Sequence, residues 1–172
     1  DFSAIRRNLH DYLKLDVEKP SLLHTCFLQL AAKLASQERL NLLRFLPLWD
    51  LQHLRAEDYQ RHRAEDGKEY PSLAEKVIQQ AGKEAAASGD SQDLNYILPY
   101  LDAAIARFPD NVWLKLDKAK GLLGLGRRDD ALAFGMAVTK AKANDYWAWE
   151  LLGDIVALTD PTAALACYCK AL

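Results

Sequence analysis

The sequence of 172 residues predicts an all-α fold. Long stretches of Leu, Ala, Lys, Glu and Gln, which lose little side-chain freedom in a helix, are interrupted by only six prolines and eight glycines. Apolar residues recur every three or four positions, whereas strand signals are almost absent. Half of the residues are hydrophobic and 27% are charged, so the chain can bury enough apolar surface to be globular.

Residues 1–54 are predicted to form an N-terminal helical region. Its first helix is indicated by apolar residues on one stripe: Phe2, Ile5, Leu9, Tyr12 and Leu13. A second helix is expected from Pro20-Ser21, because proline suits a first helical turn. Its predicted buried residues are Leu23, Phe27, Leu30 and Leu34. We expect these two helices to pack as a hairpin. A short apolar segment follows, and Pro47 is expected to limit the length of a helix there, because proline removes a backbone hydrogen bond.

Residues 55–70 are predicted to form a charged loop or linker. The tetrapeptide Arg55-Ala56-Glu57-Asp58 recurs as Arg63-Ala64-Glu65-Asp66, and Gly67 follows. We interpret this mixed-charge segment as a charged helix end plus a loop, and therefore as a domain boundary.

Residues 71–172 are predicted to form further helices. Ser72 and Glu75 have the spacing of a capping box, in which each side chain accepts a hydrogen bond from the other residue's backbone. The helix that begins there is expected to end near Ala87. Another follows from about Ser91 to Arg107, with these inward residues: Leu94, Ile97, Leu98, Leu101 and Ile105.

The C-terminal third contains an internal repeat. Asp110-Asn111-Val112-Trp113 aligns with Asn144-Asp145-Tyr146-Trp147, which places Trp113 and Trp147 34 residues apart. Gly126 is predicted to end the first helix of the earlier unit in a left-handed conformation.

This repeat resembles the tetratricopeptide repeat (TPR) family, whose unit is a 34-residue antiparallel helix pair. The matching residues of the last unit are Trp149, Leu152, Gly153, Ala164, Tyr168 and Ala171. The middle unit departs from the pattern at Lys115 and Lys118. The resemblance implies antiparallel helical pairs stacked as a short right-handed solenoid, with units of about 71–109, 110–143 and 144–172. Small residues such as Ala119 and Gly153 would let paired helices approach closely.

The residue types associated with catalysis and metal binding lack the required spacing. Gly121, Gly124 and Gly126 do not form a phosphate-binding loop and fit a helix–helix turn better. Cys167 and Cys169 would point in different directions on a helix, so we expect them, like Cys26, to be core or half-buried residues. We expect no catalytic residues, no cofactor and no metal.

The candidate partner-binding residues lie on the first helix of each of the last two units. By the TPR resemblance, these helices line a concave groove with Trp113, Leu116, Lys120, Trp147, Glu150 and Asp154. Such a surface suits a peptide or helix with an apolar anchor and a basic flank. Alternatively, the two tryptophans only fill the boundary between units. That alternative does not suit the acidic residues, which are costly to bury.

The sequence therefore predicts a non-catalytic protein–protein interaction scaffold in the cytoplasm, with a protein or peptide partner. The net charge of −2 makes nucleic acid the less favoured partner, and the longest apolar stretches are too interrupted to span a membrane. The alternatives are a helical accessory module of a larger protein, which positions a catalytic or nucleic-acid-binding domain, and direct RNA binding. The start at Asp1 suggests a piece of a longer protein. The uncapped end at Leu172 suggests following sequence or self-association there.

Overall fold

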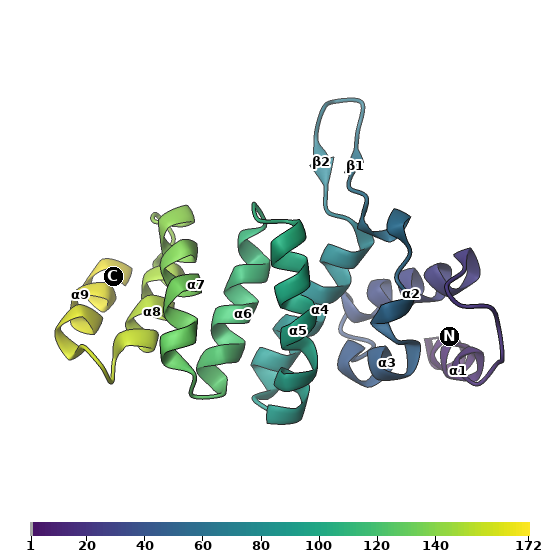
Figure 1. Cartoon of the computed structure of the whole chain (residues 1–172), viewed down its shortest axis with the longest axis horizontal. Coiled ribbons are helices and arrows are strands. Elements are labelled where there is room, and N and C mark those ends of the chain that lie inside the picture. Colours follow the sequence, from purple (N-terminus) through teal and green to yellow (C-terminus); the bar gives the residue numbers. More distant parts are fainter. Residues whose placement is uncertain (1) are drawn as a thin grey trace. The chain divides into compact units, whose positions relative to one another are not determined.

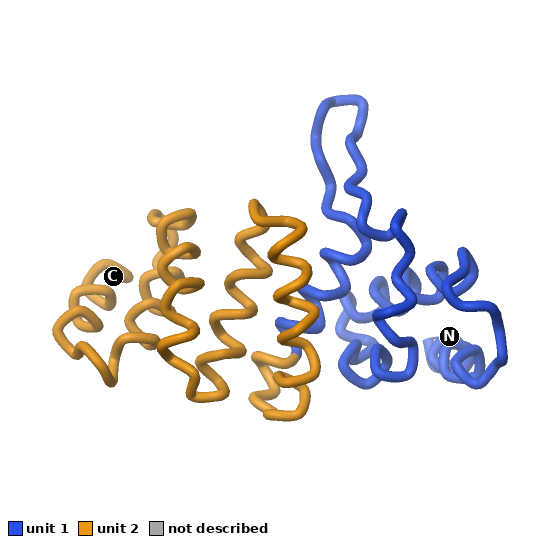
Figure 2. The backbone as a smooth tube through the Cα atoms, in the orientation of Figure 1, with its two compact units in different colours: residues 1–84 blue, residues 85–172 orange. Residues whose placement is uncertain are grey.

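The computed structural model describes residues 2–172, so Asp1, the first position of the predicted region 1–54, lies outside the described residues. Within this range the secondary structure is almost entirely helical, which confirms the all-α prediction (Figure 1). The chain divides into two compact units, residues 1–84 and 85–172 (Figure 2).

The first unit begins with three α-helices. Their bounds are α1 Phe2–Leu13, α2 Leu22–Ala35 and α3 Leu42–Trp49. Ser21 and Asn41 cap α2 and α3, because each side-chain oxygen accepts a backbone N–H of the first turn. Trp49 is fully buried and donates its indole N–H to the carbonyl oxygen of His24 at 3.0 Å. Trp49 thus connects α3 to α2 within the core of the unit.

Helices α1 and α2 contact each other through aromatic side chains. The Tyr12 and Phe27 rings are stacked with centroids 3.6 Å apart. The hydroxyl of Tyr12 also forms a 2.8 Å hydrogen bond with Nδ1 of the buried His24. The expected packing of the first two helices is therefore present.

The prediction of which α2 residues are buried is partly wrong. Leu23 and Leu30 are exposed, whereas His24 and Thr25 are buried. The polar pair can be buried because both side chains form hydrogen bonds there. His24 bonds to the Trp49 carbonyl, and the Thr25 hydroxyl donates to Asp58 at 3.0 Å.

The charged segment contains a β-hairpin that the sequence did not predict. Two 3-10 helices, η1 Leu51–His53 and η2 Ala56–Tyr59, precede the antiparallel strands β1 His62–Arg63 and β2 Glu69–Tyr70. The hairpin projects from the helices of its unit (Figure 1). Gly67 permits its turn with φ of 81°, a conformation that other residues rarely adopt. The expected α-helical end is therefore absent from residues 55–70, and the predicted loop contains a short hairpin.

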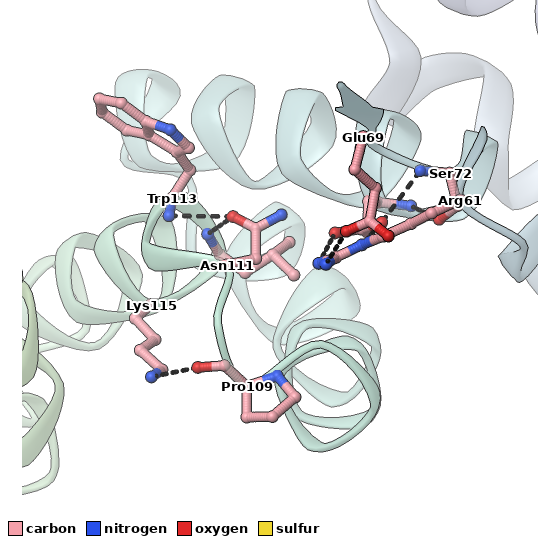
Figure 3. Close-up of polar contacts among 9 residues, drawn as sticks. Arg61, Glu69, Ser72, Pro109, Asn111, Trp113 and Lys115 are labelled. Atoms are coloured by element: carbon pink, nitrogen blue, oxygen red, sulfur yellow. Dashed lines mark hydrogen bonds and ion pairs between the residues drawn. The ribbon is translucent and has the colours of Figure 1, made fainter. Parts of the chain in front are cut away.

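Helix α4, Leu73–Ser88, begins with the predicted capping box. The Glu75 N–H donates to Ser72 Oγ at 3.1 Å, and the Ser72 N–H donates to Glu75 Oε2 at 2.9 Å. The buried Glu75 carboxylate also accepts two hydrogen bonds from Arg61, one from Nε at 2.9 Å and one from Nη2 at 2.6 Å. Figure 3 includes Arg61, Ser72 and a further partner of Arg61, Glu69. The base of the hairpin is thus fixed to the start of α4.

The second unit continues with five helices. They are α5 Ser91–Arg107, α6 Val112–Gly124, α7 Arg128–Ala141, α8 Tyr146–Val156 and α9 Pro161–Ala171. Each contacts the next along the chain, and short turns make neighbours antiparallel (Figure 1). Gly126, with φ of 72°, follows the end of α6 as predicted. The predicted inner face of α5 is buried except at Ile105, which is half-buried.

Candidate partner-binding face

The N-terminus of α6 fixes the position of Trp113. The side-chain oxygen of Asn111 accepts the backbone N–H of Trp113 at 3.0 Å and that of Leu114 at 3.4 Å (Figure 3). Trp113 is the second residue of α6, and Trp147 is the second residue of α8. The 34-residue offset therefore places both indoles at the same point of successive first helices.

The two indoles contact each other and remain partly open to solvent. Their ring centroids lie 5.6 Å apart with an interplanar angle of 24°. Trp113 is 42% exposed and Trp147 is half-buried. Nζ of Lys142 lies 5.3 Å from the Trp113 ring centroid, within range of a cation–π interaction. The tryptophans thus pack together while still offering surface to a partner.

Two carboxylates extend the Trp147 side of α8. Glu150 and Asp154 follow Trp147 at intervals of three and four residues, so the three share one stripe of the helix. Both carboxylates are exposed. Within residues 2–172, the Glu150 side chain forms no hydrogen bond or ion pair, so its carboxylate is accessible to another molecule.

Asp154 has an intramolecular partner. The Tyr168 hydroxyl on α9 donates to Asp154 Oδ1 at 2.9 Å. This hydrogen bond is the main cause of a raised pKa of Tyr168. The Asp154 side chain is therefore exposed while its orientation is fixed by the neighbouring helix.

The two remaining predicted residues lie on α6 and differ in exposure. Leu116 is only 7% exposed and packs into the interior, so it offers little surface. Lys120 is exposed. We use the name "candidate face" for the exposed or half-buried members of the predicted set: Trp113, Lys120, Trp147, Glu150 and Asp154.

Three neighbouring residues were missed by the sequence reasoning. Lys142 and Tyr168 touch members of the candidate face, and Tyr146 is strongly exposed beside Trp147. Tyr146 could have been noticed from its place in the repeated tetrapeptide. Lys142 carries no periodic signal, because it lies in the turn between α7 and α8.

Close helix packing supports this part of the second unit. A Cβ atom added at Gly153 would lie 2.5 Å from Cε1 of Tyr168, a distance that real Cβ atoms do not adopt. The predicted need for a small residue at Gly153 is therefore confirmed. Only glycine lets the Tyr168 ring lie against α8 and reach Asp154.

The two lysines that depart from the repeat pattern have defined partners. Lys115 donates to the Pro109 carbonyl oxygen at 2.6 Å (Figure 3). Lys118 is 8% exposed, pairs with Asp102, and lies 4.2 Å from the Phe134 ring centroid. Burial lowers the pKa of Lys118. Its long stem replaces an apolar side chain while its charge stays paired.

Two short segments are rich in arginine, residues 61–63 and 127–128, and three of these arginines already have partners. Arg61 binds Glu75 and Glu69, Arg127 pairs with Asp130, and Arg128 donates to backbone carbonyls of α8. A guanidinium held in this way is less available to a phosphate. The arrangement disfavours segments 61–63 and 127–128 as nucleic-acid contacts.

The cysteines and other metal-ligand types are dispersed. In the described part of the chain, no three His, Cys, Asp or Glu side chains form a group suited to a metal ion. The expectation for the thiols is wrong for Cys26 and Cys169, which are exposed, whereas Cys167 is buried. None of the described helices has the length and apolar character required to cross a bilayer.

The structure thus defines an all-α protein whose second unit is a series of antiparallel neighbouring helices. Residues 112–172 match a family described as a domain of unknown function, DUF7017. The match covers less than half of the chain, extends from α6 to α9, and contains every predicted partner-binding residue. It is not a match to a TPR family. No curated protein and no solved structure matches the chain.

Proposed function

We propose that the chain is a non-catalytic protein–protein interaction scaffold that binds a partner segment at the candidate face. The observation that carries the proposal is Trp113, which is 42% exposed while stacked on Trp147. Partly exposed aromatic side chains held rigidly by their neighbours are typical energetic centres of protein interfaces. Exposed Glu150 and Asp154 supply negative charge on the same stripe as Trp147.

The chemistry of the candidate face favours a partner with an apolar anchor and a basic flank. The anchor would pack on the indoles, and the basic side chains would approach Glu150 and Asp154. Glu150 suits this role because no described side chain neutralises it. Lys120 and Lys142 would select against strongly basic segments near Trp113.

We further propose that residues 71–172 form a TPR-like right-handed solenoid. Three observations support this proposal. Each of the ranges 71–109, 110–143 and 144–172 contains two helices. Trp113 and Trp147 occupy equivalent positions in successive first helices, and Gly153 permits the close approach of a helix pair.

The other expectations remain proposals of lower rank. An accessory module of a larger protein could use the same candidate face to position a catalytic or nucleic-acid-binding domain. Direct RNA binding is less favoured because several arginines are engaged. Self-association through α9 would use exposed Leu165. A cytoplasmic location is supported by three free thiols.

The proposal is tested by affinity capture from the source cells, read by mass spectrometry with and without nuclease. The test bait carries Glu150→Lys and Asp154→Lys. The control bait carries Glu65→Lys and Asp129→Lys, which make the same change in net charge at exposed carboxylates outside the candidate face. We expect a nuclease-resistant partner that binds wild type and control but not the test bait. Equal recovery by all three baits contradicts the proposal.

A further inference from the structure

The first unit contains a cavity of about 770 Å³, separate from the candidate face. Its walls come from the second half of α2, from segment 55–62, and from residues 71–80 at the start of α4. The volume lies within the roughly 300–1,000 Å³ common for ligand sites. All of these walls belong to the same compact unit.

The charged side chains that line the cavity are Lys33, Arg55 and Lys76 against Glu57 and Asp58, which leaves an excess of one positive charge. Lys33 from α2 and Lys76 from α4 both line it, and both are exposed. Among residues 2–172, neither lysine forms an ion pair. The cavity therefore places two cations of separate helices around one space.

The carboxylates of the cavity already have a cationic partner. Asp58 accepts the Arg55 guanidinium at 3.4 Å and the Thr25 hydroxyl at 3.0 Å. Glu57 lies 4.0 Å from the same guanidinium. Both acids therefore contact Arg55, and neither forms an ion pair with Lys33 or Lys76.

The remaining polar groups suit a peptide main chain. Gln29, Gln60 and Gln79 line the cavity, and each amide offers both a donor and an acceptor, as a peptide bond does. His62 is the one aromatic side chain among the residues that line the cavity, and its ring offers a nucleobase a smaller stacking surface than Phe, Tyr or Trp would. The mixture favours an anionic peptide over a nucleic acid.

We propose that this cavity binds an acidic peptide segment, whose carboxylates pair with Lys33 and Lys76 and whose main chain bonds to the glutamine amides. The inference goes beyond the proposed function, because it concerns a second site with opposite charge preference in another unit. Its test does not depend on the candidate face.

The test uses fluorescence anisotropy with a labelled peptide of alternating glutamate and serine. Its comparison peptide has glutamine in place of glutamate. The cavity variant is Lys33→Gln/Lys76→Gln, and the control is Lys83→Gln/Lys140→Gln, which removes the same charge at exposed positions outside the cavity. Circular dichroism verifies that both variants fold.

We expect saturable binding of the glutamate peptide that weakens about tenfold or more in the cavity variant, and by less than about twofold in the control. The glutamine peptide should bind at least about tenfold more weakly than the glutamate peptide. Three results would overturn the proposal: no binding by wild type, equal losses in both variants, or tighter binding of a uridine oligonucleotide of equal charge that also depends on Lys33 and Lys76.

Discussion

The indole rings of Trp113 and Trp147 are stacked with centroids 5.6 Å apart, although the two residues are separated by 34 positions in the chain. The stack joins the first turn of α6 to the first turn of α8. It is both a packing contact and the exposed aromatic part of the candidate face. These two roles can be separated by experiment.

A double-mutant cycle with Trp113→Ala and Trp147→Ala measures the packing role. Aromatic pairs in such geometry contribute about 0.5–1.5 kcal/mol beyond the area they bury. We expect the two substitutions to be coupled by about 1 kcal/mol in the free energy of urea unfolding.

The cycle of Trp113→Ala with Trp149→Ala is the matched control. Trp149 donates its indole N–H to the Ala143 carbonyl oxygen and lies near Lys170. The coupling there should be below about 0.5 kcal/mol. Equal coupling in both cycles would show that the Trp113–Trp147 stack contributes no specific stability.

The substitution Gly153→Ala should destabilise the second unit. The new methyl group would collide with the Tyr168 ring, and overpacking of this kind costs about 1–3 kcal/mol. Over most of this range the cost exceeds the roughly 1 kcal/mol that alanine gains over glycine in helix propensity. The free energy of urea unfolding should fall, and the Tyr168–Asp154 hydrogen bond should be disturbed.

Gly121→Ala is the control for this substitution. Its Cβ would meet only side-chain ends, Leu94 Cδ2 at 3.3 Å and Leu98 Cδ2 at 3.7 Å, which can move. We expect a change near zero. A loss as large as that of Gly153→Ala would mean that any methyl group on these helices is harmful.

The substitution Arg61→Ala should lower the stability of the first unit. Glu75 is buried, and its carboxylate relies on the Arg61 guanidinium and the Ser72 N–H. Breaking a buried pair from one side costs about 3–5 kcal/mol, and the partial exposure of Arg61 puts Arg61→Ala at the lower end. A second change, Glu75→Gln, should recover part of the loss.

Glu69→Gln tests whether the loss comes from burial. Glu69 also pairs with Arg61, at 3.1 Å, but its side chain is more than half exposed. Such surface pairs contribute about 0–1 kcal/mol. Chemical denaturation followed by circular dichroism should show a much larger loss of unfolding free energy for Arg61→Ala than for Glu69→Gln. Equal losses would refute the claim that burial of Glu75 causes the effect.

The buried His24 should make the first unit less stable at acidic pH. Its Nε2 faces the Trp49 carbonyl, which can only accept, so Nε2 carries the proton and Nδ1 accepts from Tyr12. Burial lowers the pKa of His24 below its ordinary value of 6.5. The unfolded chain therefore binds the proton more readily than the folded chain.

The expected result follows from this difference. The contribution of His24 is fully present above about pH 6.5 and declines below it, by at most about 1.4 kcal/mol per pH unit. Urea unfolding between pH 8 and 5.5 measures the slope. His24→Gln should flatten it, whereas His10→Gln, at an exposed position, should not. An unchanged slope in His24→Gln would exclude His24 as the cause.

Local signals made much of the fold predictable. The Ser72–Glu75 capping box and the turn at Gly126 depend on side chains within a few residues, and both were predicted. The buried face of α2 was not, because it depends on contacts that His24 and Thr25 make with residues more than 20 positions away. The hairpin of β1 and β2 was missed because each strand has only two residues.

The candidate site was predictable in its spacing but not in its exposure. The 34-residue period identified Trp113 and Trp147 as equivalent positions, and the structure brings their rings together. Periodicity could not tell that Leu116 is buried, because it depends on how neighbouring helices pack. The cavity near Lys33 and Lys76 gave no sequence signal, since its walls come from three separate segments.

The most direct test of the central claim is photo-crosslinking in the source cells. A benzophenone amino acid is placed at position 150 in the candidate face or, as control, at exposed position 136 on α7. We predict a discrete crosslinked protein from position 150 that disappears when the same chain carries Trp113→Ala, and none from position 136. Identical products from both positions, or products that nuclease removes, would contradict a protein-docking role for the candidate face.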